Sequence, residues 1–307
     1  MKAVQFSEYG DPEVLHVADV DEPHAGPGQI RVAVRAASVN PIDWKVRKGM
    51  MADGPLAAPV TPGSDVAGVV DEVGEGVDGV APGDAVFGFA IGGAAAERTL
   101  LEHYARKPEG VSFEEAAGYP VAVETAARTL DLLGVGEGQT LLITGAAGGV
   151  GTAAVQLARR RGARVIGTAS EHNHDFLRSL GAEPTTYGDG LVERVRALAP
   201  DGVDLALDTA GRGALPDLIE LTGSPEKVVT IADFSAPELG VRVSSGRGTE
   251  RAYHALAEAA QLAQDGQFSL PVERTFAFRQ AADAQRLSEA GHVRGKLVLV
   301  PETPAGS

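Results

Sequence analysis

The stretch from residue 141 to residue 170 constrains the fold most, because it reads as strand, glycine-rich turn, helix and strand. Residues 141–144 (LLIT) form a short apolar run that is typical of a buried parallel strand. Glycines follow it at once, and a helix with apolar side chains at helical spacing comes next. Three arginines at 159–161 and then Gly162 suit the end of that helix. Residues 164–169 then predict a second strand, which completes a βαβ unit.

The turn between the first strand and the helix predicts a dinucleotide-binding site. Glycines let the chain turn sharply and let a ligand approach the backbone closely. The free backbone N–H groups of a helix start attract a pyrophosphate. The alternative is a tight turn with no ligand. We expect the pyrophosphate to contact this turn, through Gly145, Ala147, Gly148, Gly149 and Val150.

The end of the second strand predicts which dinucleotide binds. An NAD-binding fold usually has an acidic residue about 20 residues beyond the glycines, which accepts the ribose 2′-OH. Here Thr168 is followed by the small neutral Ser170 at that position, and then by Glu171, His172 and His174. Neutral and cationic donors favour a 2′-phosphate, and a carboxylate repels it. We therefore expect NADPH, although Glu171 turned inward would favour NAD and the histidines could instead lie at a solvated helix start.

Composition limits the other function classes. The chain has 307 residues, 44% of them apolar, and a formal net charge of −15. No Lys/Arg cluster exceeds residues 159–161, so nucleic acid and anionic membranes are not expected as partners. Cysteine is absent, which rules out disulfides and thiolate metal ligands. With no apolar signal core at the N-terminus and no run of about 18 apolar residues, we expect a soluble, cytoplasmic protein.

The chain changes character at about residue 113. Before it, short β-type runs alternate with turns such as GPG and PGD, which is a barrel-like pattern. After it, helices and strands alternate, which predicts a doubly wound parallel sheet. We expect β-runs at 2–6, 29–37, 65–73, 85–89 and 95–100, a helix at 114–133 broken at Pro120, strands at 204–208, 227–232, 242–244 and 295–300, and helices at 251–265 and 280–290.

Several motifs in register resemble one family. They are MKAVQFSEYGDPEVL at the N-terminus, AASVNPIDWKVRKG (36–49), PGSDVAGVVDEVGEGV (62–77), the GAAGGVG turn and the closing GHVRGKLVLV (291–300). Together they resemble the zinc-independent quinone oxidoreductases, the zeta-crystallin-like group of the medium-chain dehydrogenase/reductase superfamily. The resemblance implies an α/β chain with a GroES-like β-barrel domain (1–117), a Rossmann domain with a doubly wound parallel sheet (118–255) and a C-terminal segment (256–307) that returns to the first domain.

The resemblance also bears on metal and substrate. Zinc-dependent relatives carry an early cysteine, a GHE motif and a four-cysteine lobe, whereas this chain has GSD at 63–65 and no cysteine. We therefore expect no metal. Without zinc to polarise a carbonyl, hydrogen-bond donors must do so, or the acceptor must already be activated. Quinones and α,β-unsaturated carbonyls are activated acceptors, so we expect hydride transfer from NADPH to one of them. The alternatives are a biosynthetic enoyl reductase for a polyketide-type intermediate, and a non-catalytic NADPH-binding sensor or structural protein.

The resemblance assigns the catalytic candidates to one segment. Asn40 and Asp43 match the family's recurrent Asn and Asp, and Lys45 stands where many relatives have Tyr. Lys45 could donate a hydrogen bond or a proton to the reduced acceptor, or it could be a solvated lysine beside Trp44. Asn40 could hold the nicotinamide ribose or the acceptor. Asp43 could instead pair with Lys45 or Arg47 on the surface, or cap the turn after it.

Further cofactor contacts follow from the same resemblance. Thr125 matches a family threonine that approaches the nicotinamide. Tyr187 matches a family tyrosine that lies near the adenosine 2′-phosphate. Glu124 stands where the family usually has an apolar residue, and it could face the substrate. The remaining candidates are Asp208 and Ala210 in DTAG, Ile231 and Phe234 in IADF, and Lys296 in the closing motif. Ordinary strand-end structure would explain the DTAG and IADF segments nearly as well. Family members are usually dimers joined by exposed edge strands of the Rossmann sheets, so we expect a homodimer through 227–232 and 239–244.

Overall fold

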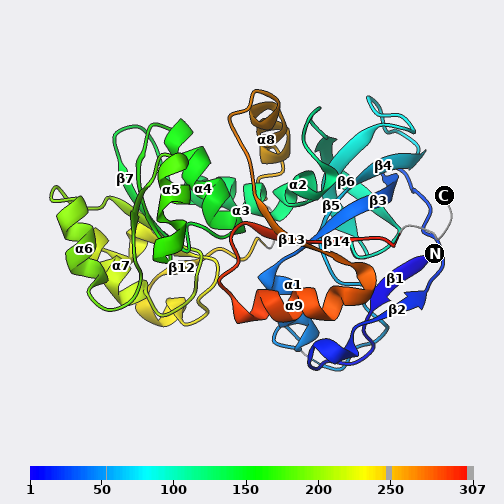
Figure 1. Ribbon diagram of the computed structural model, residues 1–307, viewed down its shortest axis with the longest axis horizontal. Helices are drawn as coiled ribbons and strands as arrows, with labels where there is room; N and C mark the ends of the chain where they lie inside the picture. The colour runs from blue at the N-terminus through cyan, green and yellow to red at the C-terminus, as the bar shows by residue number, and fades with distance from the viewer. Residues whose placement is uncertain (53, 247–250, 303–307) are drawn as a thin grey trace. The chain divides into compact units, whose positions relative to one another are not determined.

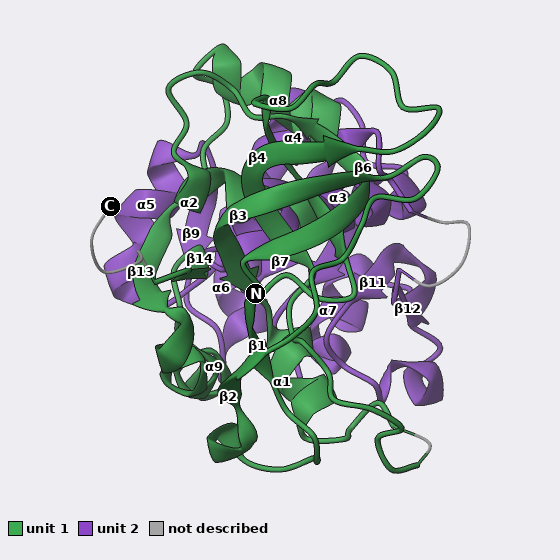
Figure 2. Cartoon of the chain, turned by 90° about the vertical axis from the view of Figure 1, so that its right-hand side faces the viewer, with its two compact units in different colours: residues 1–121, 256–307 green, residues 122–255 purple. Residues whose placement is uncertain are grey.

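The computed structural model describes residues 1–52, 54–246 and 251–302 (Figure 1). The chain divides into two compact units (Figure 2). The first contains Met1–Val121 and Leu256–Ser307, and the second contains Ala122–Ala255. Both ends of the chain therefore build one unit, and the other is inserted between them. None of the helices in the described ranges is long and apolar enough to cross a membrane.

A β-barrel forms the first unit. Its sheet has the order β13-β14-β3-β4-β5-β6, and an additional pairing of β3 with β6 closes four of the strands on themselves. The long β3 makes this possible, because Ile30 to Ala33 pair with β6 while Ala37 to Val39 pair with β14. The strands are β3 (Ile30–Val39), β4 (Asp65–Val73), β5 (Ala85–Ile91), β6 (Arg98–Arg106), β13 (Val272–Ala277) and β14 (Lys296–Val300).

Apolar side chains fill the barrel. Val32, Val34, Val66, Val86 and Leu101 are among its buried residues. The alternation along β3 explains this, since successive side chains of a strand point to opposite faces. The pairing of β14 with the end of β3 also has a consequence for function. It sets Leu297 opposite Val39, and so brings the C-terminal motif beside the residues that follow β3.

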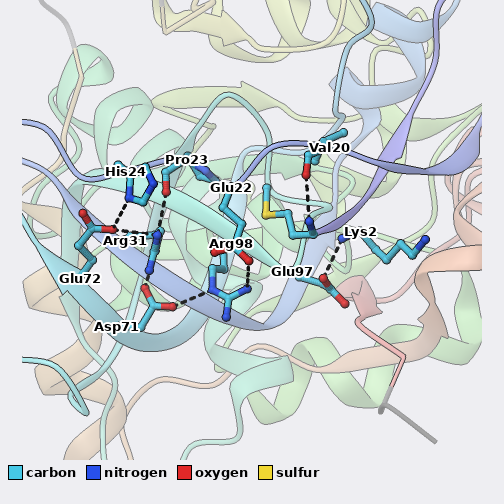
Figure 3. Close-up of polar contacts among 11 residues, drawn as sticks. Lys2, Val20, Glu22, Pro23, His24, Arg31, Asp71, Glu72, Glu97 and Arg98 are labelled. Atoms are coloured by element: carbon cyan, nitrogen blue, oxygen red, sulfur yellow. Dashed lines mark hydrogen bonds and ion pairs between the residues drawn. The ribbon is translucent and has the colours of Figure 1, made fainter.

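An N-terminal hairpin and short helices complete this unit. The hairpin consists of β1 (Lys2–Gln5) and β2 (His16–Asp19). Figure 3 shows how the segment after β2 is held: Arg98 pairs with Glu22 and Asp71, while Arg31 pairs with Asp71 and donates to the Pro23 carbonyl. The helices are α1 (Pro41–Arg47), α2 (Phe113–Ala117), α8 (Ala255–Gln264) and α9 (Ala281–Ala290).

A parallel six-stranded sheet forms the second unit, with the order β12-β11-β10-β7-β8-β9. Numbered from β7 along the chain, this is the 6-5-4-1-2-3 order of a doubly wound dinucleotide-binding fold. The strands are β7 (Thr140–Thr144), β8 (Arg164–Thr168), β9 (Glu183–Thr185), β10 (Leu205–Asp208), β11 (Val228–Thr230) and β12 (Arg242–Val243). The helices are α3 (Tyr119–Leu133), α4 (Gly149–Arg160), α5 (His174–Ser179), α6 (Leu191–Leu198) and α7 (Leu215–Thr222). The first residues of α3 belong to the first unit. The expected combination of a GroES-like barrel and a Rossmann sheet is confirmed.

Two local expectations are wrong. The helix over 114–133 breaks at Gly118 rather than at Pro120, which is the second residue of α3. Proline is tolerated there because the first-turn N–H groups have no partner within the helix. Residues 227–232 do not form an edge strand either. β11 lies between β10 and β12, so both of its sides are already hydrogen-bonded.

Candidate active site

The glycine turn of the second unit has the geometry that a pyrophosphate needs. Gly145 has φ of 67°, and an added Cβ there would lie 2.8 Å from Thr209 Oγ1. At Gly151 an added Cβ would lie 2.3 Å from the carbonyl oxygen of Gly145. The start of α4 can therefore approach the end of β7 only because these positions lack side chains. The first-turn amides, including those of Gly149 and Val150, have no acceptor within the helix and can donate to an anion.

The ends of the neighbouring strands hold this turn in place. Thr168 Oγ1 at the end of β8 accepts a hydrogen bond of 3.3 Å from the amide of Gly145. The buried Asp208 carboxylate at the end of β10 accepts from the hydroxyls of Thr144 (2.6 Å) and Thr230 (2.7 Å). It also accepts from the amides of Ala210 and Gly211, both at 3.1 Å. Asp208 thus ties three strand ends together, and only the backbone of its segment is left for a cofactor.

The residues expected around a 2′-phosphate follow the ends of β8 and β9. The hydroxyl oxygens of Ser170 and Tyr187 lie 3.1 Å apart. The side chain of Tyr187 is half exposed, as a ligand-contacting residue must be. His172 and Glu171 are exposed on the short helix after Ser170. His174 Nε2 lies 3.3 Å from the carbonyl of Ala169, so one of its ring nitrogens already has a partner in the protein.

Helix α3 contains a buried ionic cluster. The Glu124 carboxylate accepts from Arg128 Nε at 2.8 Å, from Arg251 at 3.1 Å and from the amide of Ala252 at 3.1 Å. Arg128 also donates to Ser244 Oγ. Thr125 lies beside the cluster, 3.4 Å from both Glu124 and Arg128. Glu124 therefore pairs inside the second unit, where it holds the segment after β12 against the helix.

A second buried polar cluster lies in the first unit, at the end of β3. The Asn40 side chain donates to Asp65 Oδ2 at 2.8 Å and accepts from Lys296 Nζ at 2.5 Å. Lys296 is also 3.2 Å from Asp65 Oδ2, and Ser38 Oγ donates to the same oxygen at 2.7 Å. The other oxygen, Oδ1, accepts from the amide of Val121 at 2.9 Å. The Asn40 amide group is therefore locked in one orientation.

Asp43 adds a second carboxyl to this cluster. It is buried, and its Oδ2 accepts from the amide of Asn40 at 2.8 Å, which caps α1. The alternative of a surface pair with Arg47 is wrong, because Arg47 is fully buried and bonds to Gln285 and Glu289 instead. Burial raises the pKa of Asp43 to about 7; the hydrogen bond from Asn40 opposes this, the Asp65 charge adds to it, and Lys296 opposes it.

Lys45 is half-buried rather than solvated. Its Nζ lies 5.7 Å from the centroid of the Trp44 ring, and burial lowers its pKa. Lowering the pKa of a lysine makes proton donation easier. The environment is therefore compatible with an acid that protonates a reduced acceptor.

Sequence reasoning missed the centre of the polar cluster. Asp65 is not among the predicted site residues, although it contacts Ser38, Asn40 and Lys296. A signal was available, since an acidic residue that begins a buried strand must find partners. The same cluster bears on zinc: Asp65 is paired with Lys296, and the described residues contain no group of three His, Cys, Asp or Glu that could hold a metal. The donor set does not fit a catalytic zinc.

Family models match both parts of the chain. Residues 26–129 match the alcohol dehydrogenase GroES-like domain, and residues 180–299 match a model described as zinc-binding dehydrogenase. The chain is 33% identical to 2-methylene-furan-3-one reductase of Solanum lycopersicum, over 98% of this chain and 79% of the relative. It is 32% identical to the NADPH-dependent alkenal/one oxidoreductase of Arabidopsis thaliana, over 98% and 80%. It is also 37% identical to the pikromycin polyketide synthase component PikAII of Streptomyces venezuelae, over 94% of this chain but 8% of that protein.

Solved structures show the same relationship. The quinone oxidoreductase from Coxiella burnetii superposes with a TM-score of 0.82 at 31% identity, over 98% of this chain and 99% of that one. A mycobacterial protein complexed with NADPH superposes with a TM-score of 0.85 at 26% identity, over 98% and 100%. The chain therefore belongs to the medium-chain dehydrogenase/reductase superfamily, in the group of quinone oxidoreductases and alkenal reductases.

Proposed function

We propose that this protein is an oxidoreductase that uses NADPH to reduce a quinone or an α,β-unsaturated carbonyl without zinc. The glycine turn before α4 carries the proposal, because Gly145 and Gly151 leave the backbone bare where a pyrophosphate would lie. Similar proteins that cover nearly the whole chain support it, since they are described as an alkenal/one oxidoreductase and a quinone oxidoreductase. The enzyme class follows from the family, and the substrate class from these relatives.

Preference for NADPH over NADH is the finer part of this proposal. Ser170 lies just after β8, and its hydroxyl oxygen is 3.1 Å from the hydroxyl oxygen of Tyr187. Two neutral hydroxyls bind a phosphate dianion better than a carboxylate does. They donate hydrogen bonds to the phosphate oxygens, whereas a carboxylate repels the like charge. A relative named as NADPH-dependent and a structural neighbour solved with NADPH support the same preference.

The bound cofactor would supply the hydride, and the protein's own residues would position the acceptor and meet the charge that develops on its oxygen. Lys45 is the candidate donor, because it is cationic, half-buried and more acidic than a solvated lysine. Asn40 and Lys296 form a fixed pair that we assign to the cofactor side. Thr125, Ile231 and Phe234 remain predicted cofactor contacts.

Zinc independence is part of the proposal although one family model carries zinc in its description. The chain has no cysteine, and serine and aspartate stand at 64 and 65 where zinc-dependent relatives have a GHE motif. Asp65 is neutralised by Lys296 and saturated by hydrogen bonds. No step of the proposed reaction therefore involves a metal.

Two measurements test the proposed function. Calorimetric titration of NADPH and NADH should show tighter binding of NADPH, and oxidation of NADPH should accelerate when a panel of quinones and enones is added. Equal or tighter binding of NADH would refute the cofactor preference and indicate Glu171 as its cause. Tight NADPH binding with no turnover on any acceptor would refute the enzyme proposal and favour a sensor or structural protein.

A second candidate is an enoyl reductase of polyketide biosynthesis, favoured by the 37% identity to a segment of PikAII. Turnover of an enoyl thioester with no turnover of free quinones would select it. We also propose a homodimer in the cytoplasm. β12 is the strand at one end of the parallel sheet, where another chain could pair.

A further inference from the structure

We propose that Arg194 is a positioning residue for 2′-phosphate recognition, because it holds the loop that presents Tyr187. The inference rests on the proposed NADPH site and adds a residue that the glycine motif does not contain. Arg194 lies on α6, which follows the loop after β9. Its side chain is half-buried and turned back over that loop.

One guanidinium group spans four consecutive carbonyls of the loop. Arg194 Nη1 donates to the carbonyl of Asp189 at 2.7 Å. Nη2 contacts the carbonyls of Thr186 at 3.0 Å, Tyr187 at 3.3 Å and Gly188 at 3.2 Å. The planar fork of an arginine suits such a set of acceptors, and a lysine cannot reproduce it. A single side chain therefore contacts every backbone carbonyl of residues 186–189.

Besides Arg194, the loop is supported by a hydrogen bond of 3.1 Å from the amide of Leu191 to the carbonyl of Gly188. Gly188 and Gly190 have φ of 81° and 75°, and glycine backbones are the most mobile in the unfolded and loop states. The side chain of Tyr187 is 49% exposed, so core packing does not hold it. Gly190 is also matched to Arg194, since an added Cβ there would lie 3.0 Å from Nη1. Without Arg194 we expect Tyr187 to lose its position beside Ser170.

The charge of Arg194 supports the same role. Its partners in the loop are neutral carbonyls, and across the described ranges no carboxylate lies within 4.0 Å of its nitrogens. Arg194 therefore holds the loop without bringing a carboxylate to its side chain, and a carboxylate there would repel a phosphate beside Tyr187. Arg196, two residues further along α6, differs in this respect: it is exposed and pairs with Glu220 at 2.8 Å. It provides a matched control on the same helix.

The test compares two nucleotides that differ by the phosphate alone, 2′,5′-ADP and 5′-AMP, with calorimetry on the full chain. We expect Arg194→Met to weaken 2′,5′-ADP binding about tenfold or more and 5′-AMP binding by less than about twofold, by analogy with the loss of one charge-assisted contact. Arg194→Lys, which keeps the charge but not the fork, should fall between. Arg196→Met should bind both nucleotides like the parent.

A double mutant tests whether Arg194 acts through Tyr187. If it does, Arg194→Met combined with Tyr187→Phe should bind 2′,5′-ADP no more weakly than the weaker single variant does. Fully additive losses would refute the positioning role, and so would equal weakening of both nucleotides or no change in either. The proposed function fails separately: a parent protein that binds 2′,5′-ADP selectively but reduces no acceptor refutes the enzyme proposal and leaves the role of Arg194 standing.

Discussion

Replacing Asp65 with asparagine should destabilise the first unit severely, although it changes only one group of the side chain. Asp65 is 0% exposed and Lys296 is 4% exposed, so their ion pair is out of contact with water. The two carboxylate oxygens accept from Ser38, Asn40, Lys296 and the amide of Val121. An asparagine keeps one oxygen and turns an NH2 group toward donors on the other side. It also leaves the ammonium of Lys296 without its counter-charge.

The size of the effect follows from that uncompensated charge. Removing one member of a buried pair costs about 3–5 kcal/mol, because the desolvated partner stays behind. This is a large fraction of the roughly 5–15 kcal/mol that holds a typical domain together. A matched surface control is Asp71→Asn. Asp71 pairs with Arg31 and Arg98 but is 27% exposed, so we expect a loss of about 1 kcal/mol or less for each pair.

Urea unfolding followed by tryptophan fluorescence measures this directly. Trp44 is the only tryptophan and lies on α1, in the same unit as Asp65. The double variant Asp65→Asn with Lys296→Met should be more stable than the sum of the two single losses predicts, because it removes the stranded charge. An Asp65→Asn protein within about 1 kcal/mol of the parent, or strictly additive losses, would refute the buried-pair reasoning.

Burial raises the pKa of Asp43 from its ordinary value of 3.8 to about 7. Between about pH 4 and pH 7 the folded protein therefore keeps a proton on Asp43 that the unfolded chain has released. The free energy of unfolding should consequently fall as pH rises through this range. Asp43→Asn should remove up to about 1.4 kcal/mol per pH unit of that slope, and an unchanged slope in urea titrations would contradict it. Lys45→Met should lower turnover by roughly 10²–10³ with little change in NADPH affinity if Lys45 is the donor, whereas turnover within about twofold of the parent would eliminate it. Chelator treatment should leave activity unchanged and elemental analysis should find no stoichiometric zinc; activity lost on chelation and restored by zinc would overturn the interpretation of residues 63–65. Light scattering at micromolar concentration should give a dimer mass, and a monomer mass would count against pairing at β12.

The apolar periodicity and turn residues of the sequence predict most of the strands and helices, because these elements are encoded by residues that are neighbours in sequence. Strand β4 lies at Asp65–Val73, the range expected from its apolar run, and α9 and β14 begin within one residue of their expected positions. The strand–turn–helix of the glycine motif is likewise encoded in about 30 consecutive residues, since glycine alone permits the close approach at Gly151. Short elements such as β2 and β9 escaped prediction because a few residues carry no clear periodicity.

The site itself depended on contacts between distant residues. The sequence by itself determined which chemistry-bearing residues are present: Asn40, Asp43, Lys45, Ser170 and Tyr187 were all named from their motifs. Only the tertiary structure decided their partners, because Lys296 reaches Asn40 across 256 residues through the pairing of β14 with β3. It also decided the pKa of Asp43, which burial and the Asp65 charge raise and the hydrogen bond from Asn40 and the Lys296 charge lower. Hydrogen bonds and desolvation depend on which groups are close in space. The sequence therefore lists the chemical groups of the site but not the burial, charges and hydrogen bonds that set their pKa values.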